Sequence, residues 1–316
     1  MENANFQTIL EDLKISFKFA VKNVISYLLA IFGVLIVSTI LLAVVAALIF
    51  IPLFFVIGGF ENLIVYFESF GSIDDIGVTN IALGAILFGL PFLAPIFVAF
   101  GAMFGMGREI VESEGTSAEG VFVWYKKKFF SLAGGGMILF LVVLGPLILA
   151  LIGGTAIYGA QFLNMGLMHA GPSGMLNPVL LGLLLIWFAI STGLLSMLFP
   201  SIIDGYSVFE STKRSIRMSI KYFDRVFGVW ITFLLILGAI FLPIIAAPFA
   251  VGIGALGIGI MAVYMLPAML FLVFVFLPAM TIGLTRVYMI LTAVDDDDYE
   301  HTPEEDESGP SFIGGV

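Results

Sequence analysis

Six long apolar segments alternate with shorter, more polar ones along the chain of 316 residues. Each apolar segment is longer than the roughly 20 residues with which an α-helix crosses a bilayer. Backbone groups in lipid must be hydrogen-bonded within the segment itself, so apolar runs of this length predict helices. The pattern therefore predicts an all-α polytopic membrane protein with six transmembrane helices, over residues 24–57, 79–106, 131–158, 176–203, 226–251 and 261–291.

The basic residues of the chain lie on one side of these segments. All 13 Lys and Arg residues precede the first segment, fall between the second and third or the fourth and fifth, or lie at the end of the sixth. Positive charge beside membrane spans stays in the cytoplasm. We therefore expect a cell-membrane protein with both termini and the connections 107–130 and 204–225 in the cytoplasm.

Pairs of apolar segments follow a common order. The sequence Gly-Thr-Ser at 115–117 recurs as Gly-Tyr-Ser at 205–207, and each copy begins a basic amphipathic stretch that leads into a span. The start of the chain has a similar stretch. This order predicts three tandem hairpins, each preceded by a cytoplasmic amphipathic helix, around a pseudo-three-fold axis along the membrane normal. The alternative is that any six-span protein with positive inner loops looks periodic in pairs.

The amphipathic stretches are the candidates for contact with the membrane surface. Two of them have the spacing of a capping box, at Thr8 with Glu11 and at Ser207 with Glu210. Such helices lie in the interface, with apolar side chains in lipid and cations toward anionic headgroups. Their basic residues are candidate contacts for anionic lipid, or for a membrane or cytoplasmic protein partner: Lys126, Lys127, Lys128, Lys213, Arg214, Arg217, Lys221 and Arg225.

Composition excludes several classes of function. The chain is 60% hydrophobic and 11% charged, and six spans leave no room for a soluble catalytic domain. It has no Cys, which excludes disulfides, thiolate metal sites and Cys nucleophiles. A nucleic-acid partner is not expected, because the basic residues adjoin spans where lipid headgroups compete for them.

Catalytic and cofactor motifs are absent or out of context. The run Gly-Ile-Gly-Ala-Leu-Gly at 252–257 matches a dinucleotide fingerprint, but it connects two membrane segments and follows no strand. The two histidines, His169 and His301, lie in an outer connection and in the tail, so they form no catalytic dyad. We therefore expect no enzymatic activity, no cofactor and no metal site.

Ionisable residues are missing from the centres of the six segments. Proton relays and ion-coupled carriers usually place such groups there. Those that lie near cytoplasmic ends are expected to pair or to extend toward the interface: Arg108, Glu109, Asp204 and Arg286. Any transport pathway would therefore suit an apolar or amphiphilic solute.

The C-terminal segment differs from the rest of the chain. Residues 295–307 contain nine Asp and Glu and neither Lys nor Arg. A segment of this composition cannot bury enough apolar surface to offset the entropy of ordering it. The sequence therefore predicts a transmembrane domain over 1–294 and an acidic, disordered tail over 295–316.

One stretch of the middle third of the chain resembles a known family. The run Pro-Ser-Ile-Ile-Asp-Gly at 200–205, followed by 207–211 and by Lys-Arg-Ser at 213–215, is similar to the signature of YciC-like polytopic proteins. It is also similar to the membrane domain attached to some glycerophosphodiester phosphodiesterases. The resemblance implies a six-helix membrane domain without assigned chemistry. Phosphodiesterase activity is not implied, because no such domain is present. The Asp-rich tail and the scarcity of Lys also resemble archaeal, halophilic proteins.

Two functional hypotheses follow. The first is an integral membrane protein without enzymatic activity, acting as a membrane-embedded subunit or scaffold of a larger assembly. The second is a carrier or permease for a lipid or another amphiphile, in which helices kinked at proline enclose a cavity. An intramembrane enzyme is disfavoured because the catalytic groups it would need are missing.

Overall fold

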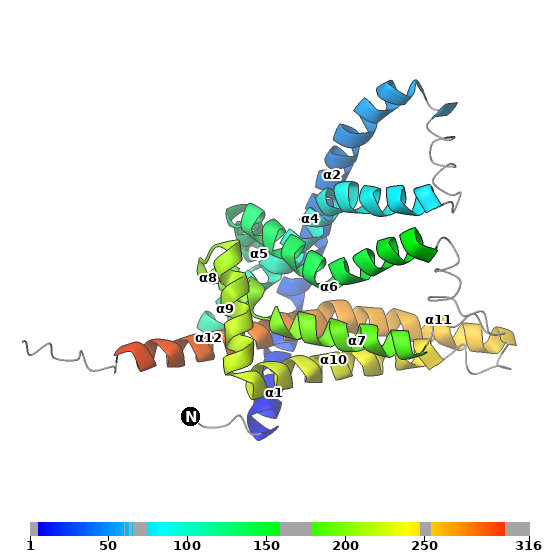
Figure 1. Cartoon of the computed structure of the whole chain (residues 1–316). Coiled ribbons are helices and arrows are strands. Elements are labelled where there is room, and N and C mark those ends of the chain that lie inside the picture. Colours follow the sequence, from blue (N-terminus) through cyan, green and yellow to red (C-terminus); the bar gives the residue numbers. More distant parts are fainter. Residues whose placement is uncertain are drawn as a thin grey trace, which may run out of the picture.

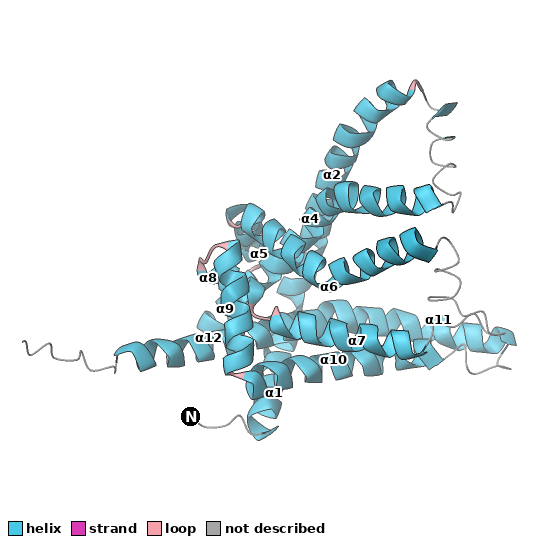
Figure 2. Cartoon of the chain, in the orientation of Figure 1, coloured by secondary structure: helices cyan, strands magenta, loops and turns pink. Residues whose placement is uncertain are grey.

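A computed structural model describes residues 6–59, 61–62, 65, 75–158, 178–246 and 254–300. The regular structure of these residues is entirely helical (Figure 2). In chain order the helices are α1 (Phe6–Lys22), α2 (Val24–Ile57), α4 (Asp75–Ser113), α5 (Ala118–Lys127), α6 (Phe129–Tyr158), α7 (Pro178–Leu194), α8 (Leu198–Asp204), α9 (Val208–Lys221), α10 (Phe223–Ala246), α11 (Gly254–Phe271), the π-helix η3 (Leu272–Phe276) and α12 (Leu277–Glu300).

Six stretches of the described helices are long and apolar enough to cross a membrane. The first three lie in α2, α4 and α6, the fourth covers α7 and α8, the fifth lies in α10, and the sixth runs from α11 into α12. The protein is therefore an all-α, multi-pass membrane protein, which confirms the prediction from the six apolar segments. The stretches are Val24–Val56, Phe92–Ser113, Phe129–Leu149, Gly182–Asp204, Phe223–Pro243 and Val263–Val294.

Two predicted segments differ from the helices that contain them. α4 continues to Ser113, beyond the predicted end at residue 106, because a helix that leaves the bilayer needs no apolar residues to propagate. The fourth segment is interrupted between Leu194 and Leu198. Pro200 has no N–H to donate to the carbonyl of Ser196, so the chain restarts as α8 with the proline in its first turn.

The sixth segment contains a wider turn in place of a break. In η3 the amide of Leu277 donates to the carbonyl of Leu272, five residues earlier, and Pro278 follows directly. A π-turn of this kind absorbs the local distortion that a proline introduces into a helix.

α12 extends beyond the predicted transmembrane domain. It ends at Glu300, so its last six residues, 295–300, are helical although the sequence predicts a disordered tail from 295. A helix that has already nucleated in the membrane propagates over polar residues at little cost, which explains the difference. The rest of the predicted tail lies outside the described residues, as does the outer connection that contains His169.

The helices form a bundle with three short helices at one end (Figure 1). α4, α6, α7, α10 and α11 run side by side, whereas α2 leaves the bundle obliquely. α1, α5 and α9 cross the spans at the end where α8 and α12 also lie. We call these three short helices the collar.

Each collar helix joins the following span through a single residue. The three joining residues are Asn23, Lys128 and Tyr222, with φ and ψ of −107° and 18°, −117° and 18°, and −115° and 43°. At each of them the amide donates to the carbonyl four residues earlier, and the carbonyl accepts from the amide four residues later. The three junctions therefore share one backbone geometry.

The collar helices pack on the spans in a cyclic order. α5 packs on α2 and α4, and α9 packs on α6, α7 and α8. α1 packs on α10 and α12, the last spans of the chain. α5 and α9 therefore contact spans that come before their own in the chain, and α1 contacts the last two spans. The predicted three tandem hairpin units, and their overlay by a common rotation, stay a prediction.

Candidate functional site at the charged end of the bundle

A buried carboxylate joins three helices at the collar. The Asp12 side chain of α1 is 3% exposed. Its Oδ2 accepts from Arg225 Nε at 3.1 Å and Nη2 at 3.0 Å on α10, and its Oδ1 accepts from Arg286 Nη1 on α12. A buried carboxylate is tolerated only when it is paired in this way. Asp12 therefore ties the first helix of the chain to two of the last.

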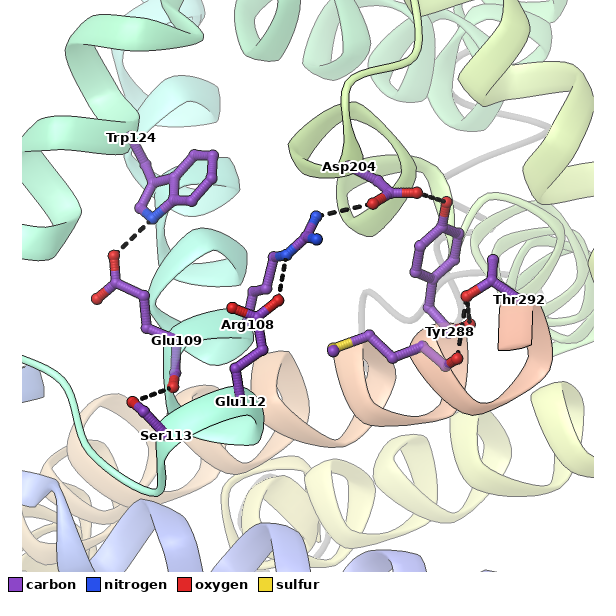
Figure 3. A network of polar contacts seen from close by, with 9 residues as sticks. Arg108, Glu109, Glu112, Ser113, Trp124, Asp204, Tyr288 and Thr292 are labelled. Carbon is purple, nitrogen blue, oxygen red and sulfur yellow. Dashed lines mark hydrogen bonds and ion pairs between the residues drawn. The ribbon is translucent and has the colours of Figure 1, made fainter. Parts of the chain in front are cut away.

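A second ionic network joins the C-terminal parts of α4 and α8 to the middle of α12 (Figure 3). Arg108 Nη1 donates to Asp204 Oδ1 at 2.8 Å, and its Nε donates to Glu112 Oε1 at 2.8 Å. The hydroxyl of Tyr288 donates to the other oxygen of Asp204 at 2.9 Å. The Arg108 and Asp204 side chains are 30% and 29% exposed, so salt screens their attraction more than that of the Asp12 pairs.

Glu109 fixes α5 against α4. Trp124 Nε1 donates to Glu109 Oε1 at 2.8 Å, and the Thr116 hydroxyl donates to Oε2 at 2.6 Å (Figure 3 shows the Trp124 contact). The Trp124 ring lies directly over Gly105, where any side chain would overlap it. The glycine and the carboxylate therefore set the position of α5 together.

The N-terminus of α9 is closed by the predicted capping box. The Ser207 side chain accepts from the Glu210 amide, and the Glu210 side chain accepts from the Ser207 amide. The hydrogen bonds from Ser207 hold the pKa of the Glu210 carboxyl below its usual value. The box predicted at Thr8 is wrong, because α1 begins at Phe6 and Thr8 lies inside the helix.

α1 and α9 each bury a stripe of small residues against the spans, and the two stripes have matching positions. On α9 the buried stripe contains Ser211, Ser215 and Ser219, which stand 11, 7 and 3 residues before Tyr222. At the same distances before Asn23, α1 buries Asp12, Ser16 and Ala20. The Ser215 hydroxyl donates to the Leu194 carbonyl at 2.8 Å and accepts from the Met197 amide at 3.1 Å, which bonds backbone groups at the interruption after α7.

Three large apolar residues of the collar helices are exposed. Phe6, Phe209 and Ile220 are 68%, 82% and 64% exposed. Side chains of this kind at the end of a membrane bundle are suited to the lipid interface.

The predicted contact residues divide into two groups. Four are engaged within the collar. Arg225 binds Asp12, Arg214 packs at 4.4 Å from the Tyr206 ring, and Lys127 and Lys221 lie 5.3 and 5.0 Å from the rings of Trp124 and Tyr222. Arg225 is thus a structural ion-pair partner, not a free contact.

Lys126, Lys213 and Arg217 are exposed, as are Lys127 and Lys221, and Lys128 is the junction between α5 and α6. Sequence reasoning missed the role of Asp12, although its position on the small-residue stripe with Ser16 was a signal.

An apolar cavity lies between α4, α6, α7, α8, α10 and α12. Its volume is about 310 Å³, and its walls are mainly Phe and aliphatic side chains with Trp230 and Ser196. Leu144 and Phe188 are its most exposed lining residues, at 38% and 41%, so its mouth lies by α6 and α7. Because the cavity is open at its mouth, apolar molecules can enter it. We therefore expect apolar molecules of the bilayer to fill it.

The described residues contain no group of three or more His, Asp or Glu that could hold a metal ion. Comparison of the chain with protein-family models, with curated proteins and with solved structures found no match. The resemblance to YciC-like proteins therefore stays an expectation from the sequence.

Proposed function

We propose that the protein is a non-enzymatic, membrane-embedded scaffold, whose collar lies at the cytoplasmic surface and holds a partner protein there. The one-sided distribution of Lys and Arg supports the cytoplasmic orientation. The scaffold role rests on two groups of charged residues at this end of the bundle. One group forms ion pairs within the protein, and the other is exposed on the collar helices.

Charged residues beneath the collar form ion pairs within the protein. Asp12 binds Arg225 and Arg286, and Arg108 binds Asp204. These contacts join helices that are far apart in sequence, so they favour a rigid platform. A rigid, pre-organised surface binds a partner without a large ordering cost.

Charges on the outer side repeat in a fixed pattern. Phe209, Lys213 and Ile220 share one face of α9 and are exposed. α1 has Leu10, Lys14 and Val21 at the same distances from its junction, also exposed. This pairing of a lysine with outward apolar side chains is the observation that carries the proposal. The apolar side chains suit the lipid interface and would hold the lysines at the membrane surface, where an acidic partner can contact them.

The proposal is tested by co-purification in mild detergent. One variant carries Lys14→Gln, Lys126→Gln and Lys213→Gln, and its matched control carries Arg at the same positions. A partner that binds the collar is expected to co-purify in fixed ratio with the wild type and the Arg control, and to be lost from the Gln variant. A wild-type protein without a stoichiometric partner, or equal recovery from all three, would contradict the scaffold role.

A second candidate function is a carrier for a lipid or another amphiphile. The cavity by α6 and α7 favours it, because its walls are apolar and its lining residues Leu144 and Phe188 are exposed. Transport by the purified protein in liposomes would distinguish a carrier from a scaffold that only binds lipid.

A further inference from the structure

The ion pairs around Asp12 leave one positive charge without a counter-ion. The single carboxylate of Asp12 binds two guanidinium groups, those of Arg225 and Arg286. Within the described part of the chain, neither arginine forms a second ion pair. Their side chains are 19% and 23% exposed, so water solvates the excess charge only in part. A bound anion would therefore stabilise this site.

The second ionic network at this end has the opposite balance. Arg108 is a single guanidinium between two carboxylates, those of Asp204 and Glu112. An anion added at Arg108 would be repelled by the carboxylates already there. The excess of positive charge is therefore specific to the Asp12 site, where α1, α10 and α12 meet.

Three nitrogen atoms of the Asp12 site are available to a ligand. Arg225 uses Nε and Nη2 to bind Asp12, and Arg286 uses Nη1. The remaining nitrogens, Nη1 of Arg225 and both Nε and Nη2 of Arg286, bond to no described residue. None of the three is a buried atom, although buried atoms without a partner do occur elsewhere in the described protein. These N–H groups can therefore be reached from outside.

Nearby acids leave the excess charge in place. Glu11 and Asp224 are exposed and form an ion pair with neither arginine. Asp295, the first acid of the C-terminal segment, follows Arg286 by nine residues, which is about 14 Å along α12. This distance exceeds the Debye length of about 8 Å at physiological salt. α12 therefore carries its acidic end away from the site.

The position of the site suits a phosphate ester. The planar fork of a guanidinium group matches two oxygens of a phosphate. Both arginines lie toward the collar ends of their spans, Phe223–Pro243 and Val263–Val294, where lipid headgroups begin. Farther along α10, Ile231 and Leu235 are 43% and 68% exposed and offer an apolar surface to acyl chains.

We infer that Arg225 and Arg286 bind a phosphate ester, with two of its oxygens on Nε and Nη2 of Arg286 and a further contact from Nη1 of Arg225. Asp12 is a positioning residue, because it holds both guanidinium groups in place. The phosphate can belong to a phospholipid headgroup or to a soluble ester, and the two sources share this chemistry. The inference does not depend on the scaffold role, because no partner protein takes part.

Thermal unfolding of the delipidated, full-length protein in a neutral detergent tests the site. The probes are dioleoyl phosphatidic acid, dioleoylglycerol, which lacks the phosphate, and glycerol 3-phosphate, which lacks the chains. We expect phosphatidic acid to raise the unfolding temperature saturably and dioleoylglycerol to leave it unchanged. Protection by glycerol 3-phosphate at the same concentration would assign the site to soluble esters, and protection by the lipid alone to headgroups. Equal protection by dioleoylglycerol, or none by either phosphate ester, would overturn the inference.

Arg286→Gln locates the binding site. It removes the excess charge, leaves the pair of Asp12 with Arg225, and should weaken binding of phosphatidic acid about tenfold or more. The matched control is Arg108→Gln, which removes an arginine of similar exposure from the other network and should leave the affinity unchanged. Equal losses in the two variants would show a general effect of surface charge and would contradict a defined site.

Arg286→Lys tests the fork and remains informative if the Gln variant is unstable. Lysine keeps the positive charge beside Asp12 but has no planar pair of N–H groups. Its affinity for phosphatidic acid should lie between those of the wild type and Arg286→Gln. An affinity equal to that of the wild type would show that charge alone attracts the lipid and would rule out the two-oxygen contact.

Discussion

The collar end of the bundle and the opposite end differ in what holds the helices together. Near the collar, α2 buries Tyr27, Ala30 and Val34, and the ionic networks of Asp12 and Asp204 join neighbouring helices. In its far half, α2 leaves Leu48 and Phe55 70% and 76% exposed and diverges from the bundle (Figure 1). Lipid is as apolar as these side chains, so the hydrophobic effect does not drive helices together within the bilayer. Specific packing is therefore concentrated where water and polar groups begin.

The largest expected effect comes from removing the buried charge at the collar. Asp12→Asn leaves Arg225 and Arg286 without their carboxylate and should lower the free energy of unfolding by about 3–5 kcal/mol. The measurement is reversible unfolding in a detergent titration. Glu11→Gln, at the neighbouring exposed position, is the control and should change stability by less than about 0.5 kcal/mol. Equal effects would show that Asp12 does not hold the three helices.

The next effect tests close packing at the same end. Gly105→Ala should destabilise the protein by about 1–3 kcal/mol, because the added methyl overlaps the Trp124 ring, which Glu109 holds in place. Trp124 fluorescence should change as the indole moves. Gly145→Ala on α6 meets open space and should be neutral or stabilising. A neutral Gly105→Ala would mean that α5 can move away from α4.

Capping of α9 should have a smaller effect. Ser207→Ala removes the side-chain cap and should cost about 1 kcal/mol. The Glu210 pKa is lowered in the folded state, so the contribution of this carboxylate is present above its unfolded pKa of 4.5 and is lost as the pH falls through the folded value. The stability difference between wild type and Glu210→Gln should therefore shrink as the pH falls below 4.5. A difference independent of pH would exclude the carboxylate as its source.

The smallest effect is expected from the partly exposed ion pair. A double-mutant cycle with Arg108→Gln and Asp204→Asn should give a coupling of about 0.5–1 kcal/mol. The coupling should fall at 1 M salt, where the Debye length is about 3 Å. A coupling as large as the effect of Asp12→Asn would remove the distinction between buried and exposed charges at this end.

The sequence predicts the spans well because the bilayer imposes one simple rule on length and polarity. It predicts the capping box at Ser207 for a similar reason, since the box is local. It does not predict the Asp12 site, whose partners Arg225 and Arg286 are 213 and 274 residues away. Contacts over such distances depend on how the collar closes, and hydropathy contains no information on that.

The sequence suggests a cavity among proline-kinked helices only as part of the carrier hypothesis, and it does not locate the walls. The walls of the cavity come from six separate helices, whose apolar residues look alike in the sequence. The one local signal is Pro200, whose missing N–H interrupts the helix at Ser196.

The most direct test concerns the side of the membrane on which the collar lies. The chain has no Cys, so single cysteines can be labelled without background. Gly115→Cys enters open space beside the collar, and Ser72→Cys lies in the connection between the first two spans. With a membrane-impermeant maleimide, we predict that residue 72 is labelled in intact cells and residue 115 only after permeabilisation. Labelling of residue 115 in intact cells, with residue 72 protected, would contradict a cytoplasmic collar.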